Sequence, residues 1–279
     1  MSTFKLLPVS NWRLDQSGSA IPHPGPDRDD SVASEVPVAM TYNRVSHVVM
    51  MATPADLEEF ALGFSLTEGL IGSVDDLLGA RVIPREGGIE VAMTITKEWF
   101  DRLSTRRRNL VGRTGCGLCG AENIEQALRW PPVVDYSLKV SHQAVQKAVA
   151  ALNTNQPLQV VTGATHGAAW CSLEGDILSL REDVGRHNAL DKLIGSLFRE
   201  EFKPANGFVL VSSRASYEMV YKTAAAGIEL IVAVSAPTTL AIEFAEHCGV
   251  TLVGFARPGC HNIYTYKDRV GDLASVSRP

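Results

Sequence analysis

The first half of the chain alternates β-prone runs with helical stripes of apolar residues. Two β-prone runs flank Asn43-Arg44 and two more flank Gly87-Gly88, so each pair predicts a β-hairpin. Between the hairpins, apolar side chains recur at i, i+3, i+4 and i+7, which predicts one buried helix face. These side chains are Leu57, Phe60, Ala61 and Phe64. A second helix is predicted over KEWFDRLSTRRRNL. We therefore expect a small α+β domain over residues 33–111.

Start signals for the first helix lie just before its apolar stripe. Thr53 is a residue type that caps helix N-termini, and Pro54 suits a first helical turn. Asp56 lies three residues after Thr53, where a capping box has its acidic residue. We expect the Thr53 side chain to cap this helix.

The second half has a different pattern. From Gly207 onwards, continuous apolar runs alternate with helix-like runs that end at Gly227 and Gly249, where a helix stop is expected. Continuous apolar strands indicate burial on both faces, as in a parallel βαβαβ unit. Two further strands are predicted around Glu174-Gly175, followed by a helix over GRHNALDKLIGSLF. We expect an α/β domain with a mostly parallel sheet over residues 130–279.

The N-terminal segment follows neither pattern. Residues 8–32 are rich in Pro, Gly, Ser and Asp, so we expect a mobile tail over residues 1–32. Among 279 residues, 45% are hydrophobic and 20% charged, as in a globular protein. The formal net charge of −5 disfavours nucleic acid and anionic membrane as partners. The start shows no leader-like apolar core, and we expect a cytoplasmic protein without a membrane segment.

Two of the five cysteines have motif spacing. Cys116 and Cys119 lie in the glycine-rich stretch GRTGCGLCGAEN, and we assign residues 112–129 to a Cys-x-x-Cys loop and linker between the domains. The odd number of cysteines argues against a secreted disulfide framework. Residues 101–115 hold five arginines against Asp101, and nearby positive charge lowers a thiol's pKa. Because the thiolate is the attacking species in sulfur exchange, this setting favours a nucleophile.

Other roles for this cysteine pair stay open. Structural zinc needs four ligands, and no second pair of ligands follows in the sequence. Cys171, His166 and His187 are the side chains that folding could add to the two thiols. A thioredoxin-like redox pair fits poorly, because an Arg-rich helix precedes the pair in place of a strand.

Polar residues gather where the predicted parallel strands end. Ligands of open α/β sheets bind at the carboxyl ends of the strands. Those ends are residues 212–216, 235–239 and 256–260, which are rich in hydroxyls and include Arg214 and Arg257. The first two segments open helices, whose N-termini attract phosphate. The pattern indicates an anionic, phosphorylated ligand, with ordinary helix capping by Ser and Thr as the alternative.

A dense mixture of charges marks a further strand-to-helix junction, at residues 181–192. Its ionisable side chains include Glu182, Asp183, Arg186, His187, Asp191 and Lys192. Such a cluster forms either a buried ion-pair network or the lining of a site. The spacing alone leaves both alternatives open.

Together these stretches resemble the FdhD family of sulfur carrier proteins. Proteins of this family are needed for formate dehydrogenase activity. The matching stretches lie between residues 35 and 266 and are EVPVAMTYNRVSHVVMMATPADLEEFALGFSLTEGLI, GRTGCGLCG, EDVGRHNALDKL, VLVSSRASYEMV and TLVGFARPG. The resemblance implies a sulfurtransferase that takes persulfide sulfur from a cysteine desulfurase. It passes the sulfur to the bis-guanine-dinucleotide molybdenum cofactor, Mo-bis(molybdopterin guanine dinucleotide), which is its bound substrate. The resemblance also implies that the second domain is cytidine-deaminase-like.

The resemblance also implies roles for particular residues. The family's persulfide cysteine maps onto Cys116. Apart from the resemblance, the chemistry of a neighbouring thiol suggests Cys119 as a second catalytic residue, which would assist release by attacking the persulfide and leaving a disulfide. The cofactor-binding segment maps onto Phe255, Ala256, Arg257, Pro258, Gly259 and Cys260. Cys260 stands where some relatives have a basic residue. The implied partners are a cysteine desulfurase, formate dehydrogenase and the molybdenum cofactor. We expect a homodimer with no stably bound metal of its own.

Two other classes of function remain as alternatives. A zinc-dependent deaminase needs His-x-Glu and Pro-Cys-x-x-Cys ligands. Here no Glu stands two residues after His166, and Gly115 precedes Cys116 in place of proline. The third class is a non-catalytic chaperone that escorts the cofactor or the dehydrogenase. Such an escort would tolerate replacement of Cys116.

Overall fold

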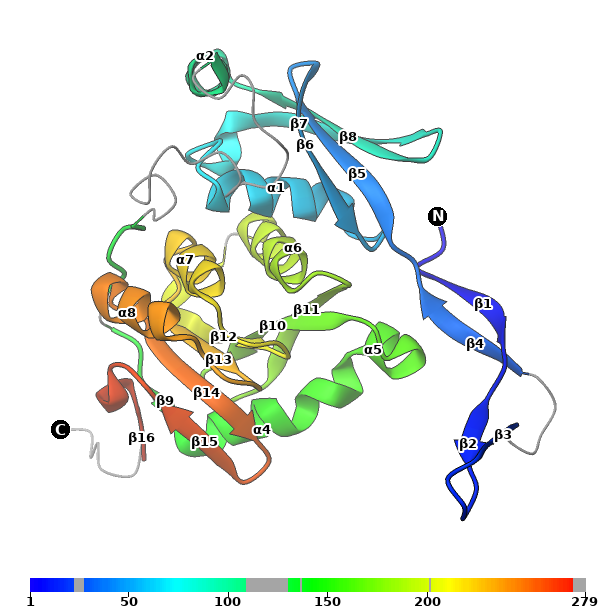
Figure 1. Ribbon diagram of the computed structural model, residues 1–279. Coiled ribbons are helices and arrows are strands. Elements are labelled where there is room, and N and C mark those ends of the chain that lie inside the picture. The colour runs from blue at the N-terminus through cyan, green and yellow to red at the C-terminus, as the bar shows by residue number, and fades with distance from the viewer. Residues whose placement is uncertain (23–27, 109–129, 136, 201, 273–279) are drawn as a thin grey trace.

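The structure is a computed structural model that describes residues 1–22, 28–108, 130–135, 137–200 and 202–272. Its N-terminal domain is a four-stranded sheet, in the order β6-β5-β8-β7, with α1 packed against one face (Figure 1). The β5–β6 and β7–β8 pairs are antiparallel, whereas β5 and β8 are parallel. The elements are β5 (Val36–Tyr42), β6 (Val45–Ala52), α1 (Leu57–Thr67), β7 (Leu77–Arg85), β8 (Gly88–Ile95) and α2 (Lys97–Arg108).

Both hairpins predicted for this domain are confirmed. The β5–β6 turn consists of Asn43 and Arg44, whose φ angles of 48° and 70° are those of a primed two-residue turn. The Asn43 side chain also holds the neighbouring strand, because its Oδ1 accepts from Ile95 N–H at 2.8 Å. In the β7–β8 turn, Gly87 has φ 79°, which a residue without a Cβ adopts readily.

The predicted cap of α1 is wrong. The helix begins after Asp56, which has φ 53° and makes no side-chain capping bond. Thr53 instead bonds to the second domain: its N–H donates to Asp183 Oδ2 at 2.9 Å, and its Oγ1 accepts from Val184 N–H at 3.1 Å. Its carbonyl also accepts from Lys192 Nζ at 2.9 Å. These partners lie about 130 residues away in the chain, so local spacing could not reveal them.

The second domain contains a six-stranded sheet in the order β11-β10-β12-β13-β14-β15. The α/β architecture is confirmed, but the expectation of a mostly parallel sheet is wrong. Only the β12–β13 and β13–β14 pairs are parallel, whereas β11–β10, β10–β12 and β14–β15 are antiparallel. The hairpin predicted around Glu174-Gly175 is β10–β11. The strands are β10 (His166–Ser172), β11 (Ile177–Asp183), β12 (Gly207–Val211), β13 (Leu230–Ala233), β14 (Thr251–Arg257) and β15 (Cys260–Ile263).

Helices cover both faces of this sheet, as strands that are apolar throughout require. On one face, Val209 and Val211 of β12 pack with α6, α7 and α8 in one core cluster. On the other face, Phe208 and Leu210 pack with α4. The helices are α4 (His142–Leu152), α5 (Pro157–Thr162), α6 (Arg186–Arg199), α7 (Tyr217–Ala225) and α8 (Thr239–Cys248).

The N-terminal segment differs from the expected tail, because its strands pair with one another. β1 pairs antiparallel with β4, and β2 with β3, in an arm that projects from the rest of the molecule (Figure 1). The residues of these strands show no regular alternation of apolar and polar side chains, so the sequence pattern did not indicate them. The strands are β1 (Phe4–Val9), β2 (Trp12–Leu14), β3 (Ala20–Pro22) and β4 (Arg28–Ala33).

The two domains meet where α1 crosses α6 (Figure 1). A Cβ atom at Gly63 would lie 1.8 Å from the Asp191 carbonyl oxygen, and one at Gly195 would lie 1.9 Å from the Glu59 carbonyl oxygen. The two helices therefore touch backbone to backbone. Only glycine permits so close an approach at these two positions.

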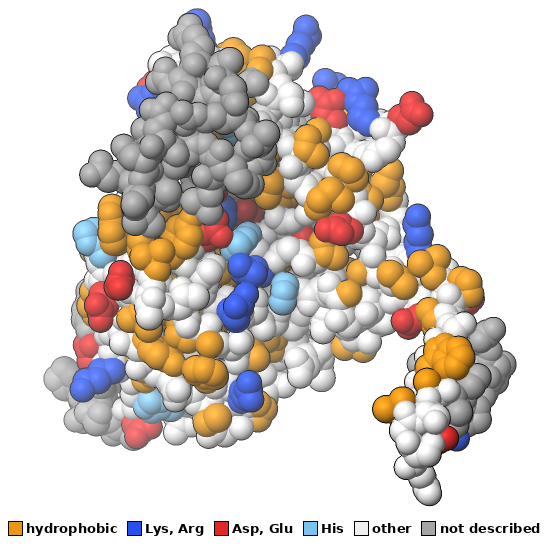
Figure 2. Space-filling model, in the orientation of Figure 1, with side chains coloured by type: hydrophobic (Ala, Val, Ile, Leu, Met, Phe, Trp, Pro, Cys, Tyr) orange, Lys and Arg blue, Asp and Glu red, His pale blue; other side chains and the backbone are white. Residues whose placement is uncertain are grey.

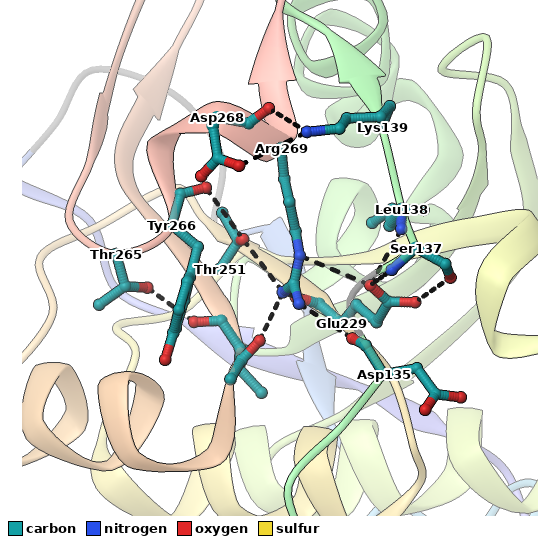
Figure 3. A network of polar contacts seen from close by, with 12 residues as sticks. Asp135, Ser137, Leu138, Lys139, Glu229, Thr251, Thr265, Tyr266, Asp268 and Arg269 are labelled. Carbon is teal, nitrogen blue, oxygen red and sulfur yellow. Dashed lines mark hydrogen bonds and ion pairs between the residues drawn. The ribbon is translucent and has the colours of Figure 1, made fainter.

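The C-terminal end of the described chain is fixed by a buried guanidinium (Figure 3). Arg269 donates to the carbonyl groups of Glu229, Gly249 and Asp135, and its Nε lies 3.5 Å from Glu229 Oε2. The Glu229 carboxylate also accepts from Ser137 and Leu138. The remaining short elements are β9 (Val140–Ser141), β16 (Val270–Gly271), η1 (Val74–Asp76), η2 (Asn153–Asn155), η3 (Pro204–Asn206) and η4 (Lys267–Arg269).

The described helices are all too short or too polar to cross a membrane. The longest of those in the second domain, α6, carries Arg186, Asp191 and Lys192 along its length.

Candidate functional site

The three strand-end segments predicted from the sequence lie side by side. Backbone hydrogen bonds join Ala215 N–H to the Ala236 carbonyl at 3.2 Å and Phe255 N–H to the Ser235 carbonyl at 3.0 Å. Segments 212–216, 235–239 and 255–260 therefore form one continuous rim at the carboxyl ends of β12, β13 and β14. Arg214 and Arg257 are both exposed on this rim.

The third segment of the rim is an irregular hairpin between β14 and β15. Phe255 has a left-handed φ of 50° and is 40% exposed, in a bulge between Gly254 and Arg257. A Cβ at Gly254 would lie 2.8 Å from the Pro237 ring, so glycine lets this strand approach the neighbouring loop. Pro258 and Gly259 (φ 89°) form the turn, and proline followed by such a glycine favours a type II turn.

Side chains that the sequence analysis did not identify hold this hairpin in place. Gln146 of α4 accepts from Gly259 N–H at 2.7 Å through Oε1, and its Nε2 donates to the Cys260 carbonyl at 3.1 Å. Nε2 also faces His261 Nδ1 at 2.9 Å, so that nitrogen accepts and the proton of His261 sits on Nε2. His261 Nε2 then donates to His142 Nδ1 at 3.0 Å. Burial, together with His142, lowers the pKa of His261.

The hydroxyl groups at the two helix starts on the rim have different partners. Thr238 caps α8, since its Oγ1 accepts from Ala241 N–H at 3.3 Å. Ser216 stands before α7 but makes no side-chain capping bond. Its Oγ lies 3.4 Å from His187 Nε2. Ordinary capping therefore accounts for Thr238 and leaves the Ser216 hydroxyl facing α6.

The charged cluster at residues 181–192 divides into a buried network and a more exposed group. Asp183 and Lys192 form an ion pair of 2.7 Å in which both side chains are fully buried. Asp191 accepts from Thr67 at 2.8 Å and from Lys222 at 3.0 Å. Burial acts to lower the pKa of Lys222, but Asp191 and Glu68 outweigh it and raise that pKa to about 12. Arg186 and His187 are only partly buried and lie at the start of α6.

Cys116 and Cys119 lie outside the described residues. Of the other thiols, Cys171 is buried in the core and burial raises its pKa, which makes it a poor nucleophile. Burial also raises the pKa of Cys248 to about 11. Cys260 is exposed on the rim hairpin. Within the described part of the chain, no three His, Cys, Asp or Glu side chains gather as metal ligands.

Comparison with known proteins identifies the family. The model of the FdhD/NarQ family matches residues 33–271. A sulfur carrier protein FdhD from Cupriavidus necator is 49% identical over 275 residues, covering 99% of this chain and 93% of the relative. The protein of the same name from Bordetella petrii is 51% identical over 243 residues, covering 87% of each. A crystal structure described as a formate dehydrogenase accessory protein from Desulfotalea psychrophila aligns with a TM-score of 0.69 and 25% identity, covering 95% of this chain and 99% of that one. This chain therefore belongs to the FdhD/NarQ family.

Proposed function

We propose that this protein is a sulfur carrier that supports formate dehydrogenase activity, and that Cys116 is the residue that carries the sulfur atom. The observation that carries the proposal is its similarity, over 99% of the chain, to a relative named as a sulfur carrier protein. The Cys116-x-x-Cys119 pair supplies the chemistry that such a role needs, in a stretch that follows an Arg-rich helix. The proposed donor is a cysteine desulfurase.

The loading step conserves atoms and electrons without an added oxidant. The Cys116 thiolate attacks the outer, sulfane sulfur of the donor's persulfide. A new S–S bond forms on Cys116 while the old one breaks, and the donor leaves as a thiolate. Cys116 then carries one additional sulfur as a persulfide.

The unloading step is where Cys119 acts. Its thiolate attacks the Cys116 sulfur, a Cys116–Cys119 disulfide forms, and the terminal sulfur leaves as hydrosulfide. The two thiols supply the two electrons that reduce the sulfane sulfur, and a cellular dithiol restores them. The acceptor in this proposal is the bis-guanine-dinucleotide molybdenum cofactor, which is a substrate of the protein.

The rim offers this acceptor suitable groups. Arg257 is an exposed guanidinium, which can fork onto phosphate oxygens. The half-exposed ring of Phe255 offers an apolar surface beside it. The turn at Pro258-Gly259 is held by Gln146, so the segment is prearranged before a ligand binds. We assign residues 255–260 to cofactor binding on these grounds.

Mass spectrometry of the intact protein tests the proposal. After incubation with a cysteine desulfurase and cysteine, the protein should gain a mass of about 32 Da that dithiothreitol removes. Cys116→Ser should abolish the gain. Cys260→Ser is the matched control, because Cys260 is also an exposed thiol, and it should load as wild type does. Loading of Cys116→Ser equal to wild type would refute Cys116 as the carrier.

Complementation in cells separates a carrier from an escort. In a strain that lacks the chromosomal copy, Cys116→Ala should leave formate dehydrogenase inactive, whereas Arg81→Ala, at an exposed position of the N-terminal sheet, should restore it. A non-catalytic chaperone would restore activity with either variant. Pull-down with the desulfurase and size-exclusion chromatography test the proposed partner and the proposed homodimer.

A further inference from the structure

The N-terminal arm, made of the β1–β4 and β2–β3 strand pairs, exposes large apolar side chains. Leu6 is 61% exposed, Trp12 63% and Leu14 71%, and Figure 2 shows hydrophobic side chains on the projecting arm. The element outside the arm that β4 contacts most is α5. A two-stranded ribbon is at best marginally stable in water unless it buries an apolar face. The arm therefore needs a surface that the described part of its own chain does not supply.

Strand β6 lies at an edge of the N-terminal sheet and has little protection against another chain. A bulge interrupts its pairing at His47, and residues 48–52, which follow the bulge, are all apolar. The strand at the opposite edge, β7, carries Arg81, Pro84 and Arg85. Charges and prolines on edge strands are common protection against association. The contrast indicates that β6, and not β7, is the edge that a partner covers.

The side chains of β6 also give the sheet an uncovered apolar face. Val48 and Met50 pack in the core cluster that includes α1. Because side chains alternate along a strand, Val49 and Met51 point to the other face. They are 54% and 48% exposed, and Figure 2 shows hydrophobic side chains where Figure 1 places β6. This face is apolar and open, as the arm is.

The arm does not cover β6 of its own chain. Val36 pairs with Ala52, so the arm leaves the sheet beside the last residue of β6. From there it continues away from the sheet and does not turn back along the strand (Figure 1). At about 3.3 Å per residue, the extended chain from Phe4 to Asp15 spans about 36 Å. A compact chain of 279 residues has a radius of gyration of about 19 Å, so the arm can reach across a neighbouring copy.

Charges near the two surfaces are complementary. Strand β4 of the arm carries Asp29 and Asp30, which are both exposed. The turn before β6 carries Arg44, which is also exposed. Strand β6 itself contains no Asp, Glu, Lys or Arg. An acidic strand can therefore approach β6 without meeting a like charge on it, and opposite charges favour the encounter.

We propose that two copies of this protein exchange their arms, so that Leu6, Trp12 and Leu14 of one copy pack on Val49 and Met51 of the other. A two-fold axis makes the contact reciprocal, and one closed dimer then covers both arms and both β6 strands. A different protein would have to supply two unrelated surfaces to cover the same groups. The proposal assigns an interface to the proposed homodimer and holds whether or not Cys116 carries sulfur.

Analytical ultracentrifugation of the full chain tests the proposal through the dissociation constant of the dimer. Trp12→Ala and Val49→Asp should each raise that constant at least about thirtyfold, because a tryptophan packed at an interface is often a hot spot and a buried carboxylate without a partner is costly. Leu178→Ala, at an exposed position of β11, and Leu78→Asp, on the opposite edge strand β7, are the matched controls. Both controls should dimerise as wild type does. A monomeric wild type, or either test variant as tight as wild type, would overturn the proposal.

A mixture of the two test variants guards against an effect of misfolding. In a mixed dimer, Trp12 of the Val49→Asp copy meets Val49 of the Trp12→Ala copy, so one of the two reciprocal contacts is intact. The mixture should therefore form dimers more tightly than either variant alone. If the substitutions acted by unfolding the chain or by damaging an unrelated interface, mixing would give no gain, and that result would refute arm exchange.

Photocrosslinking identifies what the arm touches. The photoreactive residue p-benzoylphenylalanine takes the place of Trp12 in isotope-labelled protein, which is then mixed with unlabelled wild type. A labelled peptide that contains position 12 should become joined to an unlabelled peptide that contains residues 45–52. A crosslink within one chain, or to another surface, would contradict the proposal.

The outcome can be separated from those of the other proposals. A dimer that persists in both Trp12→Ala and Val49→Asp would keep the homodimer and refute only the exchange of arms. Failure of wild type to load sulfur would refute the carrier role and leave the measured dissociation constants standing.

Discussion

At the residue scale, the molecule buries several full charges and gives each of them partners. Lys192 and Asp183 are fully buried, and Thr53 bonds to both of them. A buried ion pair of this kind contributes little net stability compared with apolar residues, but removing one member leaves an uncompensated charge. The pair therefore acts mainly to specify how α6 meets the segment before α1.

Replacing Lys192 with Met should lower the free energy of unfolding by about 3–5 kcal/mol, because Asp183 then stays buried without its cation. Urea unfolding measures the change. The double variant Lys192→Met, Asp183→Asn should recover part of the loss. Lys97→Met is the control, because Lys97 pairs with Asp101 on the surface. This substitution should lower the free energy of unfolding by less than about 1 kcal/mol. Equal costs for the two lysines would contradict this account.

Arg257 provides a residue-scale prediction for the rim. Guanosine diphosphate resembles half of one cofactor arm, and we expect it to bind at residues 255–260. Arg257→Ala should weaken that binding about ten- to a hundredfold, and Arg257→Lys should recover only part, because an ammonium lacks the fork geometry. Calorimetry at two salt concentrations measures both effects, and affinity should fall as salt rises. Cys116→Ala should bind as wild type does; equal affinities of wild type and Arg257→Ala would place the phosphates elsewhere.

At the element scale, the crossing of α1 and α6 depends on two glycines that face one another's helix backbone. Helix α6 also supplies Arg186 and His187 at its N-terminal end and Asp183 lies just before it. The positions of Arg186 and His187 are therefore set by how closely this helix approaches α1. A substitution at the α1–α6 crossing should therefore shift Arg186 and His187.

Gly63→Ala should destabilise the protein severely, because the new Cβ would overlap the Asp191 carbonyl oxygen and the helices would have to separate. We expect a loss of more than about 3 kcal/mol, the upper range for overpacked cores. Thermal unfolding followed by circular dichroism measures it. Gly79→Ala is the matched control, since a Cβ there meets no atom within 4 Å. A melting temperature of Gly63→Ala close to that of Gly79→Ala would disprove the backbone contact.

The hairpin clamp formed by His142, Gln146 and His261 predicts a dependence on pH. The pKa of His261 is lowered in the folded state, so the unfolded chain binds more protons as pH falls through about 6.5. The clamp's contribution is present above that pH and is lost below it. Stability should therefore decrease from pH 8 to pH 5.5, and less so in His261→Gln. His166 contributes in the same direction, so the unfolding free energy of His261→Gln should still depend on pH. An identical pH dependence in wild type and His261→Gln would contradict the prediction.

At the scale of the whole molecule, buried contacts tie distant parts of the chain into one unit. Thr53 and Thr67 of the N-terminal domain bond to α6, and Lys222 of α7 bonds to Thr67. Arg269 closes the far end by holding carbonyls from three separate segments (Figure 3). Each of these contacts joins residues that lie far apart in the sequence.

Arg269→Ala should cost about 3–5 kcal/mol of unfolding free energy, because it leaves Glu229 buried with its cation removed. Arg269→Lys should cost nearly as much, since an ammonium cannot reach several carbonyls at once. Denaturant titration measures both. Arg199→Ala removes an exposed ion pair with Glu58 and is the control, with little expected change. A variant of Arg269 as stable as Arg199→Ala would refute the role assigned to this guanidinium.

The elements that the sequence predicted correctly are those specified by local chemistry. Asn43-Arg44 fixes a turn, and the α1 stripe fixes a buried face. The predictions that failed concern residues whose partners are remote, such as Thr53. The β1–β4 and β2–β3 strand pairs were missed because turn-forming residues dominate the composition of this part of the chain.

The candidate site shows the same division. The rim segments were predicted from strand order alone, since parallel strands end at one edge. Gln146 and His261 were not, because a glutamine on a helix signals nothing until the hairpin is seen beside it. The charged cluster at Asp183 to Lys192 was identified from the sequence. Only the structure shows which of its side chains are buried in ion pairs, and that Arg186 and His187 are partly exposed.

The glycine crossing of α1 and α6 has a consequence for how the chain is made. The N-terminal domain leaves the ribosome first, yet the surface of α1 around Gly63 is complete only when α6 arrives, more than a hundred residues later. Until residues 183–222 emerge, Thr53 and Thr67 lack their partners and apolar surface stays exposed. Synthesis therefore passes through a long stage in which the nascent chain is a substrate for chaperones. Slowing translation before α6 should lengthen that stage and lower the yield of folded protein.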